Sequence, residues 1–530
     1  MSVTSVASAA RGQSGEDASD AQRLLRLARC PICDGDRVHY SFSLQTARVV
    51  QCADCSFSFC AESRSVTSMN AVTAVESLTQ RYGSISGILD KVIGDLAISI
   101  SSVELADWYM DGTVRLARWR SDSVKPLTDP AQESQQQRVI VSVGQLEAFS
   151  NPIESLRALC SQVKEDDIVI FIFSDVQHVG AITGTREWER LIGERAAYLT
   201  AQTALKVLFR AGFCSKGAIR LQRKVSFLSW LDGESNEAMP KTWGRRLLRL
   251  LPRPFLRHIH VTVALSDVAI VATRRKMKEP LVSVIIPVFD EAATVGPVID
   301  SVLRVHFEGA QVELIVVESN STDDSRQIVQ EYASHPRVTC IFEDSPRGKG
   351  HATRLGLNHA RGDVLIIQDA DLEYDFEDYH SLIDPILRGR EAFILGSRHG
   401  GRNHWKLRRF TKPLLAKAYN IAHVFVTAYI NVLFGLRLRD PQTMFKVFRR
   451  DCIEGVDFHS NYFNFDYELL LKIVHKGYEP IEIPVNYRSR SHAEGKKIRM
   501  WRDAPLGLWM ITKLRFTPLS SFLAFGERVE

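Results

Sequence analysis

The C-terminal half of the chain has a regular order of apolar and polar stretches. Leu281–Glu291 and Val312–Ser319 each begin with a run of Val, Ile and Leu and end in polar residues, and each is followed by a stretch with helical spacing. Short continuous apolar runs of this kind are typical of buried parallel strands. Strands that alternate with helices predict a doubly wound α/β sheet, in which ligands bind at the carboxyl ends of the strands.

Upstream of this region the composition of the chain changes several times. The first residues are small and polar and lack the apolar core of a signal peptide, so we expect a disordered leader and no export. A charged stretch ending in Pro280 is typical of a domain boundary. The expected segments are a leader (1–25), a cysteine-rich segment (26–60), a domain of mixed helices and short strands (61–276), a linker (277–280), an α/β domain (281–516) and a tail (517–530).

Composition and charge exclude several classes of protein. The 530 residues are 45% hydrophobic and 24% charged, which is ordinary for globular domains and excludes collagen-like or wholly disordered chains. Lys and Arg exceed Asp and Glu by 67 to 62, and a net charge of +5 over this length does not indicate a nucleic-acid partner. The most apolar helical pattern, 419–436, is interrupted by Asn420, His423 and Asn431, so we expect a buried or surface helix and no transmembrane span.

Four cysteines near the N-terminus form two C-x-x-C pairs. Cys30 and Cys33 are separated from Cys52 and Cys55 by 18 residues, a spacing that lets four thiolates converge on one Zn²⁺. A redox pair is the alternative, but the strand-like stretch between the two pairs argues against it. Four cysteine ligands leave no open coordination position, so the sequence predicts a zinc ribbon with a structural ion.

The segment after these cysteines resembles class I methyltransferases that carry an N-terminal zinc ribbon. Ser101–Gly112 resembles their second strand, with Glu104 in the place of the residue that holds the ribose of S-adenosylmethionine, and Leu146–Asp175 resembles a later helix and strand. No apolar strand precedes Gly83 and Gly87, so the glycine turn that lets the backbone approach the cofactor is missing. We therefore expect a degenerate, Rossmann-like domain that no longer methylates. An active methyltransferase, which would make the protein bifunctional, is the alternative.

Two aspartates, Asp369 and Asp371, follow a further apolar run in the C-terminal half. Two carboxylates directed into one cleft repel each other unless a cation bridges them. Mg²⁺ or Mn²⁺ prefers such oxygen ligands and completes its coordination with phosphate oxygens, which makes a nucleoside diphosphate the natural partner. A solvated turn is the alternative for a D-x-D pair considered alone.

Residues 281–516 resemble the inverting glycosyltransferases of family 2, which have the GT-A fold, and within them the dolichyl-phosphate mannosyltransferase-like branch. Besides the D-x-D pair, the motifs that carry the resemblance are PVFDE (287–291), VVESNSTDDS (316–325), RGKGHATRLGL (347–357), GSRHGGR (396–402), DPQTMFKVFRRD (440–451) and EGKKI (494–498). Two positions depart from the family pattern: Glu373, where many relatives have Gln, and Met444, where Gly is usual.

The resemblance assigns roles to individual residues. It implies contact with the nucleotide sugar, linked to UDP or GDP, by Pro287, Phe289, Glu291, Glu318, Asp323, Lys349, Arg354 and Asp369. It implies Mg²⁺ or Mn²⁺ at Asp369, Asp371 and Glu373, with Asp371 acting in catalysis. It implies an acceptor site formed by Arg398, Arg402, Arg488, Arg490, Lys496 and Lys497, with a solvated basic rim as the alternative.

The family reaction is a single displacement that inverts the sugar. A polyprenyl phosphate acceptor is already an anion and needs no base, whereas a hydroxyl group on a glycan needs a carboxylate, for which Asp466 and Glu468 are the candidates. A non-enzymatic scaffold is a further alternative, which the intact D-x-D and Gly-Lys-Gly elements disfavour. The resemblance therefore predicts a hexosyltransferase of cell-envelope glycan biosynthesis.

Three stretches suit peripheral contact with a membrane. Residues 241–257 are basic and amphipathic, and 419–436 and 501–516 are apolar stretches that could face lipid at the acceptor cleft. Packing of 241–257 on the neighbouring domain is the alternative. We expect the protein in the cytoplasm or at the inner face of the membrane.

Overall fold

The computed structural model describes residues 29–32, 35–43, 48–53, 56–60, 92, 102–108, 114–120, 123–126, 138–144, 146–147, 151–176, 197–226, 260–275, 279–399, 413–488 and 500–517. The chain divides into two compact units. One consists of Met1–Gly87, Ser101–Ala211 and Arg220–Ile270, and the other of Ile88–Ile100, Gly212–Ile219 and Val271–Glu530. The domain limits expected at 276 and 281 stay predictions.

A small sheet contains the described cysteine-rich residues. It has the order β1 (Val38–Ser43), β2 (Arg48–Cys52), β3 (Ser58–Cys60) and β9 (Ala197–Tyr198), and each strand is antiparallel to its neighbour. Cys30 and Cys52 are buried. Cys33 and Cys55 lie outside the described residues, so the zinc ribbon stays a prediction.

A second sheet of seven strands follows in the first half of the chain. Its order is β10 (Phe213–Ser226), β11 (His260–Arg274), β8 (Ile168–Ser174), β7 (Arg138–Val143), β4 (Ser102–Trp108), β5 (Val114–Arg120) and β6 (Ser123–Pro126). Strands β4, β7 and β8 are parallel, and helices α4 (Ile153–Gln162) and α7 (Ala201–Ala211) pack against each other. Glu104 is the third of the seven residues in β4 and pairs with Ile140 and Arg118, so it lies inside the strand and not at its end. The methyltransferase-like domain stays a prediction.

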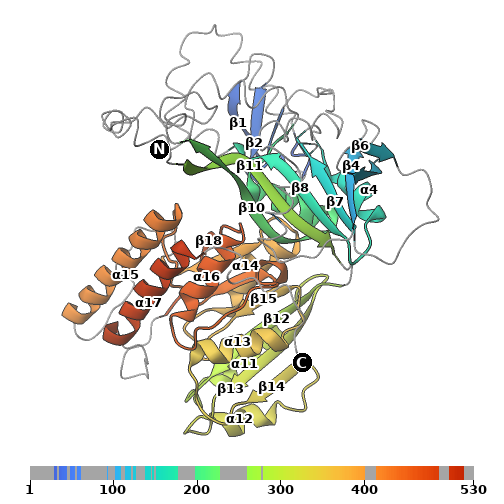
Figure 1. The fold of residues 1–530 in the computed structure, drawn as a ribbon. Helices are drawn as coiled ribbons and strands as arrows, with labels where there is room; N and C mark the ends of the chain where they lie inside the picture. Colours follow the sequence, from blue (N-terminus) through green and yellow to red (C-terminus); the bar gives the residue numbers. More distant parts are fainter. Residues whose placement is uncertain are drawn as a thin grey trace, which may run out of the picture. The chain divides into compact units, whose positions relative to one another are not determined.

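The third sheet, in the C-terminal unit, has the α/β architecture expected from the apolar runs (Figure 1). Its order is β14 (Val338–Phe342), β13 (Gln311–Glu318), β12 (Leu281–Val288), β15 (Val364–Ile367), β17 (Lys446–Arg449), β16 (Phe393–Ser397) and β18 (Ile481–Pro484). The first four strands are parallel, as predicted, whereas β17 runs antiparallel to both of its neighbours.

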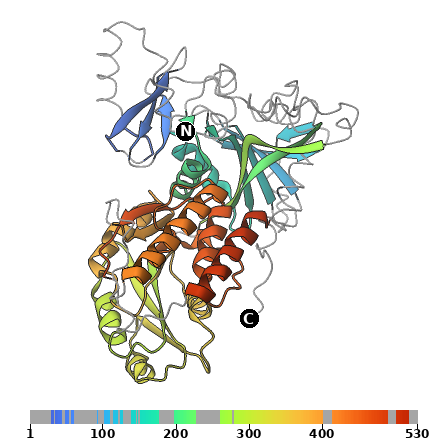
Figure 2. The same cartoon turned by 90° about the vertical axis from the view of Figure 1, so that its left-hand side faces the viewer.

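Helices connect and cover these strands. They are α11 (Val295–Arg304), α12 (Ser325–Glu331), α13 (Lys349–His359), α14 (Tyr379–Leu387), α15 (Pro413–Phe434), α16 (Phe465–His475) and α17 (Met500–Phe516). Helix α13 packs on β12 and β13, where Gly356 allows close approach: a Cβ there would lie 2.4 Å from the Ile285 side chain. Helices α15, α16 and α17 lie side by side (Figure 2). Among the described residues, none of the helices combines the length and the hydropathy needed to cross a bilayer.

A buried polar link fixes the start of the central strands. The Ser283 hydroxyl of β12 donates to Glu313 of β13 at 2.6 Å, and the Arg361 guanidinium donates to the same carboxylate at 2.8 Å. Burial alone would raise the pKa of Glu313, but these donors lower it below its ordinary value. The amino ends of β12, β13 and β15 are thereby held in register, and their carboxyl ends meet at one edge of the sheet.

Candidate active site

The loop after β12 is bound to the loop after β13. Asp290 accepts the amide of Thr322 at 2.7 Å, and Asp323 accepts the amide of Ala292 at 3.0 Å. Asp290 itself has a positive φ of 48°, a conformation that non-glycine residues adopt only when surrounding contacts hold it. The two loops form one ordered rim at the carboxyl ends of adjacent strands. This rim contains three residues predicted to contact the nucleotide sugar, Phe289, Glu291 and Asp323, and a fourth, Pro287, lies next to it near the end of β12.

Glu318, at the end of β13, is fully buried. Its Oε1 accepts the amide of Ser321 at 2.6 Å, and its Oε2 lies 3.2 Å from Nη1 of Arg326. The Arg326 guanidinium also lies over the Phe342 ring, 5.2 Å from its centroid. These contacts support a role in shaping the turn of the rim, and contact between Glu318 and the nucleotide stays a prediction.

The D-x-D pair lies in the turn after β15, as the sequence predicts. The Thr294 hydroxyl donates to the Ala370 carbonyl at 2.6 Å, which ties this turn to the rim. Asp371 Oδ1 accepts the amide of Glu373 at 3.2 Å, and Glu373 Oε2 accepts the Tyr487 hydroxyl at 2.7 Å. The two aspartates are partly exposed carboxylates on one turn, which is the donor set that a hard divalent cation prefers.

Lys349, the first residue of α13, reaches this turn. Its ammonium group donates to Asp369 and lies 6.0 Å from the centroid of the Phe463 ring. Burial alone would lower the pKa of Lys349, but the charges of Asp369 and Asp466 raise it above its ordinary value, so this lysine is a cation at neutral pH. The structure therefore brings together Lys349, Asp369 and Asp371, as expected for a site that binds a diphosphate.

Arg354, one turn further along α13, has different partners. Its Nη1 donates to the Phe458 carbonyl at 2.6 Å, and its Nη2 donates to the Asn461 side chain at 2.5 Å. The guanidinium thus holds the segment before α16. These contacts favour a positioning role, and contact between Arg354 and the diphosphate stays a prediction.

Asp466, at the start of α16, belongs to the same charged group as Lys349. Its Oδ1 lies 3.8 Å from Nζ of the fully buried Lys446. Burial raises the pKa of Asp466 above its ordinary value, although Lys446 and Lys349 oppose the shift. Asp466 is thus a carboxylate near the D-x-D turn, in a position suited to a base or to an anchor for the two lysines.

Glu468, the other candidate base, is held by the protein. It is 2% exposed, and its carboxylate accepts the amides of His459 and Ser460 at 3.0 and 2.8 Å. Lys472 donates to it at 2.7 Å from the next turn of α16. Burial alone would raise the pKa of Glu468, but Lys472 and the Ser460 amide lower it. A carboxylate engaged in this way is suited to fixing a loop and not to accepting a proton from a substrate.

Comparison with known proteins identifies this region. The model of the family "Glycosyl transferase family 2" matches residues 283–455, which include the rim, Lys349 and the D-x-D turn. The C-terminal region is a family 2 glycosyltransferase domain.

Curated relatives of the glycosyltransferase domain include sugar transferases of several organisms. The chain is 29% identical over 222 residues to the dolichol-phosphate mannosyltransferase of Pyrococcus furiosus, covering 41% of this chain and 58% of that protein. It is 29% identical over 254 residues to the polyprenol monophosphomannose synthase of Mycolicibacterium smegmatis, covering 45% and 90%. It is 28% identical over 213 residues to the low-salt glycan biosynthesis hexosyltransferase of Haloferax volcanii, covering 40% of this chain and 48%, about half, of that protein.

A solved structure also matches the chain. Glucosyl-3-phosphoglycerate synthase from Mycobacterium tuberculosis, in complex with Mn²⁺, uridine-diphosphate-glucose and phosphoglyceric acid, has 20% sequence identity and a TM-score of 0.34. The match covers 45% of this chain and 81% of the synthase.

The region that the sequence assigns to the acceptor contains a buried ion pair. Arg398, which follows β16, donates from Nε and Nη2 to the two oxygens of Asp440 at 2.8 and 2.7 Å. Burial alone would raise the pKa of Asp440, but Arg398 holds it well below its ordinary value. The guanidinium also lies 5.3 Å from the centroid of the Tyr487 ring. Arg398 is thus engaged by the protein, and its contact with an acceptor stays a prediction.

The remaining acceptor candidates are only partly described. Arg488 is exposed, and its amide donates to the Glu373 carbonyl at 2.8 Å, next to the D-x-D turn. Arg402, Arg490, Lys496 and Lys497 lie outside the described residues, as does the basic stretch 241–257. Among the described candidates, Arg488 is the cation whose position best suits an acceptor phosphate.

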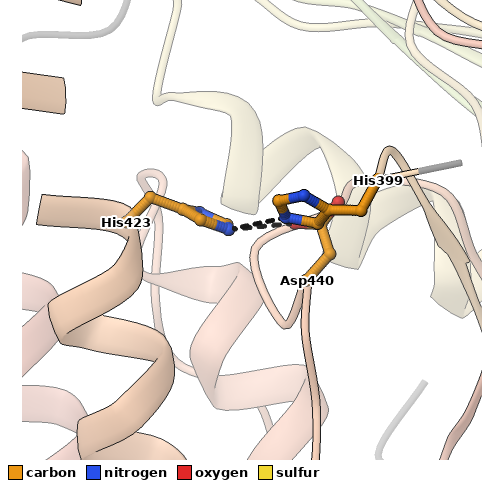
Figure 3. A group of neighbouring side chains, drawn as sticks. All are labelled: His399, His423 and Asp440. Carbon is orange, nitrogen blue, oxygen red and sulfur yellow. Dashed lines mark hydrogen bonds and ion pairs between the residues drawn. The ribbon is translucent and has the colours of Figure 1, made fainter. Parts of the chain in front are cut away.

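Two histidines that the sequence analysis did not select, His399 and His423, meet beside Asp440 (Figure 3). Nε2 of His399 lies 3.3 Å from Nε2 of His423, which in turn lies 3.8 Å from Asp440 Oδ1. All three side chains are buried. The available signals were a histidine after the G-S-R motif and a histidine within an apolar helix, and neither indicates that the two rings meet.

Proposed function

We propose that the glycosyltransferase domain transfers a sugar from a nucleoside diphosphate sugar to a polyprenyl phosphate, with a divalent cation held by Asp369 and Asp371. One observation carries this proposal: the rim formed by the loops after β12 and β13, the D-x-D turn and Lys349 are joined at one edge of the sheet. The Thr294 hydroxyl bonds to the Ala370 carbonyl, and Lys349 bonds to Asp369. A diphosphate placed there meets a lysine and two carboxylates that can share a cation with it.

The residues present fit Mg²⁺ or Mn²⁺. Asp369 and Asp371 offer hard oxygen donors from one turn, and Glu373 stays the candidate for a third ligand although it accepts the Tyr487 hydroxyl. When bound, the cation acts as a Lewis acid and neutralises charge on the departing diphosphate. Lys349 adds a second positive charge, and a diphosphate offers its ammonium group an anionic partner other than Asp369.

A polyprenyl phosphate is the acceptor that these contacts favour. It needs no general base, which agrees with the engagement of Glu468 by Lys472 and the loop amides. The names of the relatives from Pyrococcus furiosus and Mycolicibacterium smegmatis also support a polyprenyl-linked acceptor. Asp466 then serves to hold Lys349 and Lys446 in place and not to remove a proton.

An apolar surface of the C-terminal helices supports contact with the lipid. Helices α15 and α17 pack together, with the Tyr429 and Thr512 hydroxyls 2.8 Å apart. Both helices expose large apolar side chains to solvent: Ile421, Val424, Phe425, Val432, Leu506, Trp509 and Phe516. By their spacing, Ile421, Val424 and Phe425 share one face of α15, and an exposed apolar helix face agrees with contact with a membrane that carries a lipid-linked acceptor.

A thermal-shift screen tests the donor site. The full chain is heated with a panel of UDP- and GDP-sugars, with and without Mn²⁺, beside an Asp371→Ala variant. The wild type is expected to gain stability from a nucleotide sugar only when Mn²⁺ is present, and the variant to lose that gain. Equal shifts in the two proteins would contradict the role of the D-x-D turn.

A transfer assay tests the acceptor. The nucleotide sugar selected by the screen, with a radiolabelled sugar, is incubated with the protein and vesicles that contain undecaprenyl phosphate. Label is expected in the lipid fraction only when the polyprenyl phosphate is present. If the protein binds the donor and transfers the sugar to a soluble glycan but not to the lipid, it is a glycosyltransferase with an acceptor other than a polyprenyl phosphate.

A further inference from the structure

His399, His423 and Asp440 come from three separate segments of the glycosyltransferase domain. His399 follows β16, His423 lies in the middle of α15, and Asp440 lies in the loop before β17 (Figure 3). One nitrogen of each ring and one oxygen of the carboxylate all lie within 4.8 Å of one another. We propose that these three side chains bind a Zn²⁺ ion, or another borderline divalent transition metal, at a site distinct from the D-x-D turn.

The distances suit tetrahedral coordination. Zn²⁺ binds imidazole nitrogen at about 2.0–2.1 Å, so two nitrogens at neighbouring tetrahedral positions lie about 3.3 Å apart. The two Nε2 atoms are 3.3 Å apart. The distance from His423 Nε2 to Asp440 Oδ1, 3.8 Å, is about half an ångström above the tetrahedral value, which a small side-chain movement removes. Two imidazoles and one carboxylate also form a donor set typical of zinc sites with one open position.

The hydrogen bonds of Asp440 agree with metal binding. Its Oδ2 accepts both the amide and Nε of Arg398, whereas Oδ1 accepts only Nη2 of that residue among the described bonds. The carboxylate can therefore keep Arg398 through Oδ2 while Oδ1 binds the ion.

A second carboxylate, that of Glu482, interacts with the histidine pair. Glu482 accepts the amides of Arg439 and Asp440 at 2.9 and 2.5 Å, and its charge also interacts with His399. Among the described residues, the carboxylates of Asp440 and Glu482 thus lie near the rings, and the guanidinium of Arg398 and the ammonium group of Lys446 are cations that interact with Asp440. The hydrogen bonds to Asp440 from Arg398 also orient it as a ligand, as outer-shell partners do in metal sites.

The proposed ion would fasten α15 to the sheet. His423 is followed directly by Val424 and Phe425, which belong to the exposed apolar surface of this helix. Coordination of His423 together with His399 at the end of β16 would fix the rotation of α15 and hence the direction of that surface. This role is structural and does not depend on the proposed donor or acceptor.

Metal content of the full chain tests the site. The protein is stripped with a chelator and dialysed against a low concentration of Zn²⁺, with an excess of Mg²⁺ to saturate the oxygen ligands of the D-x-D turn. A His399→Gln/His423→Gln double variant leaves the Arg398–Asp440 pair intact, and His306→Gln, at an exposed histidine of the same domain, is the matched control. Wild type and control are expected to bind one Zn²⁺ more per chain than the double variant. Equal metal content in all three, with folding verified by circular dichroism, would overturn the proposal.

A second measurement separates this site from the predicted zinc ribbon and does not need the histidine variants to fold. A Cys30→Ser/Cys52→Ser variant is titrated with Co²⁺ under the same conditions. It is expected to bind one ion with the visible absorption of tetrahedral cobalt and without a thiolate charge-transfer band. Loss of all Co²⁺ binding in this variant would assign the metal to the cysteines and refute the histidine site.

Discussion

Replacement of Glu468 by Gln should destabilise the C-terminal domain more than it impairs chemistry. Glu468 and Lys472 are 2% and 3% exposed at their side chains and form a 2.7 Å ion pair. Removing one partner of such a buried pair costs about 3–5 kcal/mol, because the other charge is left uncompensated. Gln preserves the volume and one acceptor oxygen, and Lys472 keeps its bond to the Asp457 carbonyl, so the lower end, about 3 kcal/mol, is expected.

This free energy converts into a measurable melting shift. For a domain of about 150–250 residues, each kcal/mol lowers the melting temperature by about 2–4 °C, so the E468Q variant should melt about 6–12 °C below the wild type. The assay is thermal unfolding followed by circular dichroism. Glu331→Gln, at an exposed glutamate at the end of α12, is the control and should shift the midpoint by less than about 2 °C.

The pH dependence provides an independent check. The pKa of Glu468 is lower in the folded protein than its ordinary value of 4.5. A carboxyl group whose pKa is lower in the folded than in the unfolded protein stabilises the fold at pH values above its unfolded pKa. This stabilisation is lost as the pH falls through the pKa of the folded state. The gap between wild type and E468Q should therefore be full at neutral pH and shrink below about pH 4.5. An unchanged melting temperature with a large loss of turnover would refute the reasoning and make Glu468 a catalytic base.

Two further predictions concern the charged group at the D-x-D turn. If the acceptor is a polyprenyl phosphate, the Asp466→Asn variant should retain at least about a tenth of the wild-type transfer rate. If Asp466 is a general base, the same substitution should reduce the rate about 10²–10⁴-fold. The two cases are distinguished by the ratio of variant to wild-type rates, measured with the same nucleotide sugar. If Asp466 is a base, activity should rise with pH through a midpoint above the ordinary Asp value of 3.8, because its pKa is raised and only the ionised form accepts a proton. In the absence of nucleotide, the Lys349→Met variant should bind Mn²⁺ more tightly than the wild type, because Asp369 loses a competing cation. The same variant should bind the nucleotide sugar more weakly. Calorimetric titration with each ligand measures both affinities, and weaker Mn²⁺ binding by the variant would contradict the prediction.

The strands and the D-x-D turn could be predicted from the sequence because both depend on local features. A buried parallel strand is mostly apolar, so β12, β13 and β15 appear as apolar runs, broken by Ser283 in β12 and Glu313 in β13, whose polar groups bond to each other. Ligand-binding residues of such a sheet lie where those runs end, which is where Asp369 and Asp371 lie. The antiparallel insertion of β17 had no comparable signal, because a four-residue strand does not reveal its direction.

The partners of the charged residues could not be predicted in the same way. Arg398 lies in a family motif that implies contact with the acceptor, but its guanidinium bonds to Asp440, 42 positions away. Glu318, Arg354 and Glu468 were likewise chosen by motif or by position, and each has described contacts with nearby backbone or side chains. The residue type shows that a side chain can bind a group of opposite charge. The fold decides whether that group is another side chain of the protein or a bound ligand.

The same distinction limits which groups can hold an acceptor phosphate. A buried guanidinium that already makes two bonds to one carboxylate would have to leave Asp440 uncompensated in order to bind a phosphate, and breaking such a pair costs about 3–5 kcal/mol. Arg398 instead acts on the D-x-D turn through Tyr487. The Tyr487 ring contacts the Arg398 guanidinium, and its hydroxyl donates to Glu373. Through Tyr487, Arg398 is thereby linked to Glu373, the candidate third ligand of the D-x-D turn. A phosphate is held at lower cost by an exposed cation such as Arg488, whose backbone is fixed to the carbonyl of that same glutamate.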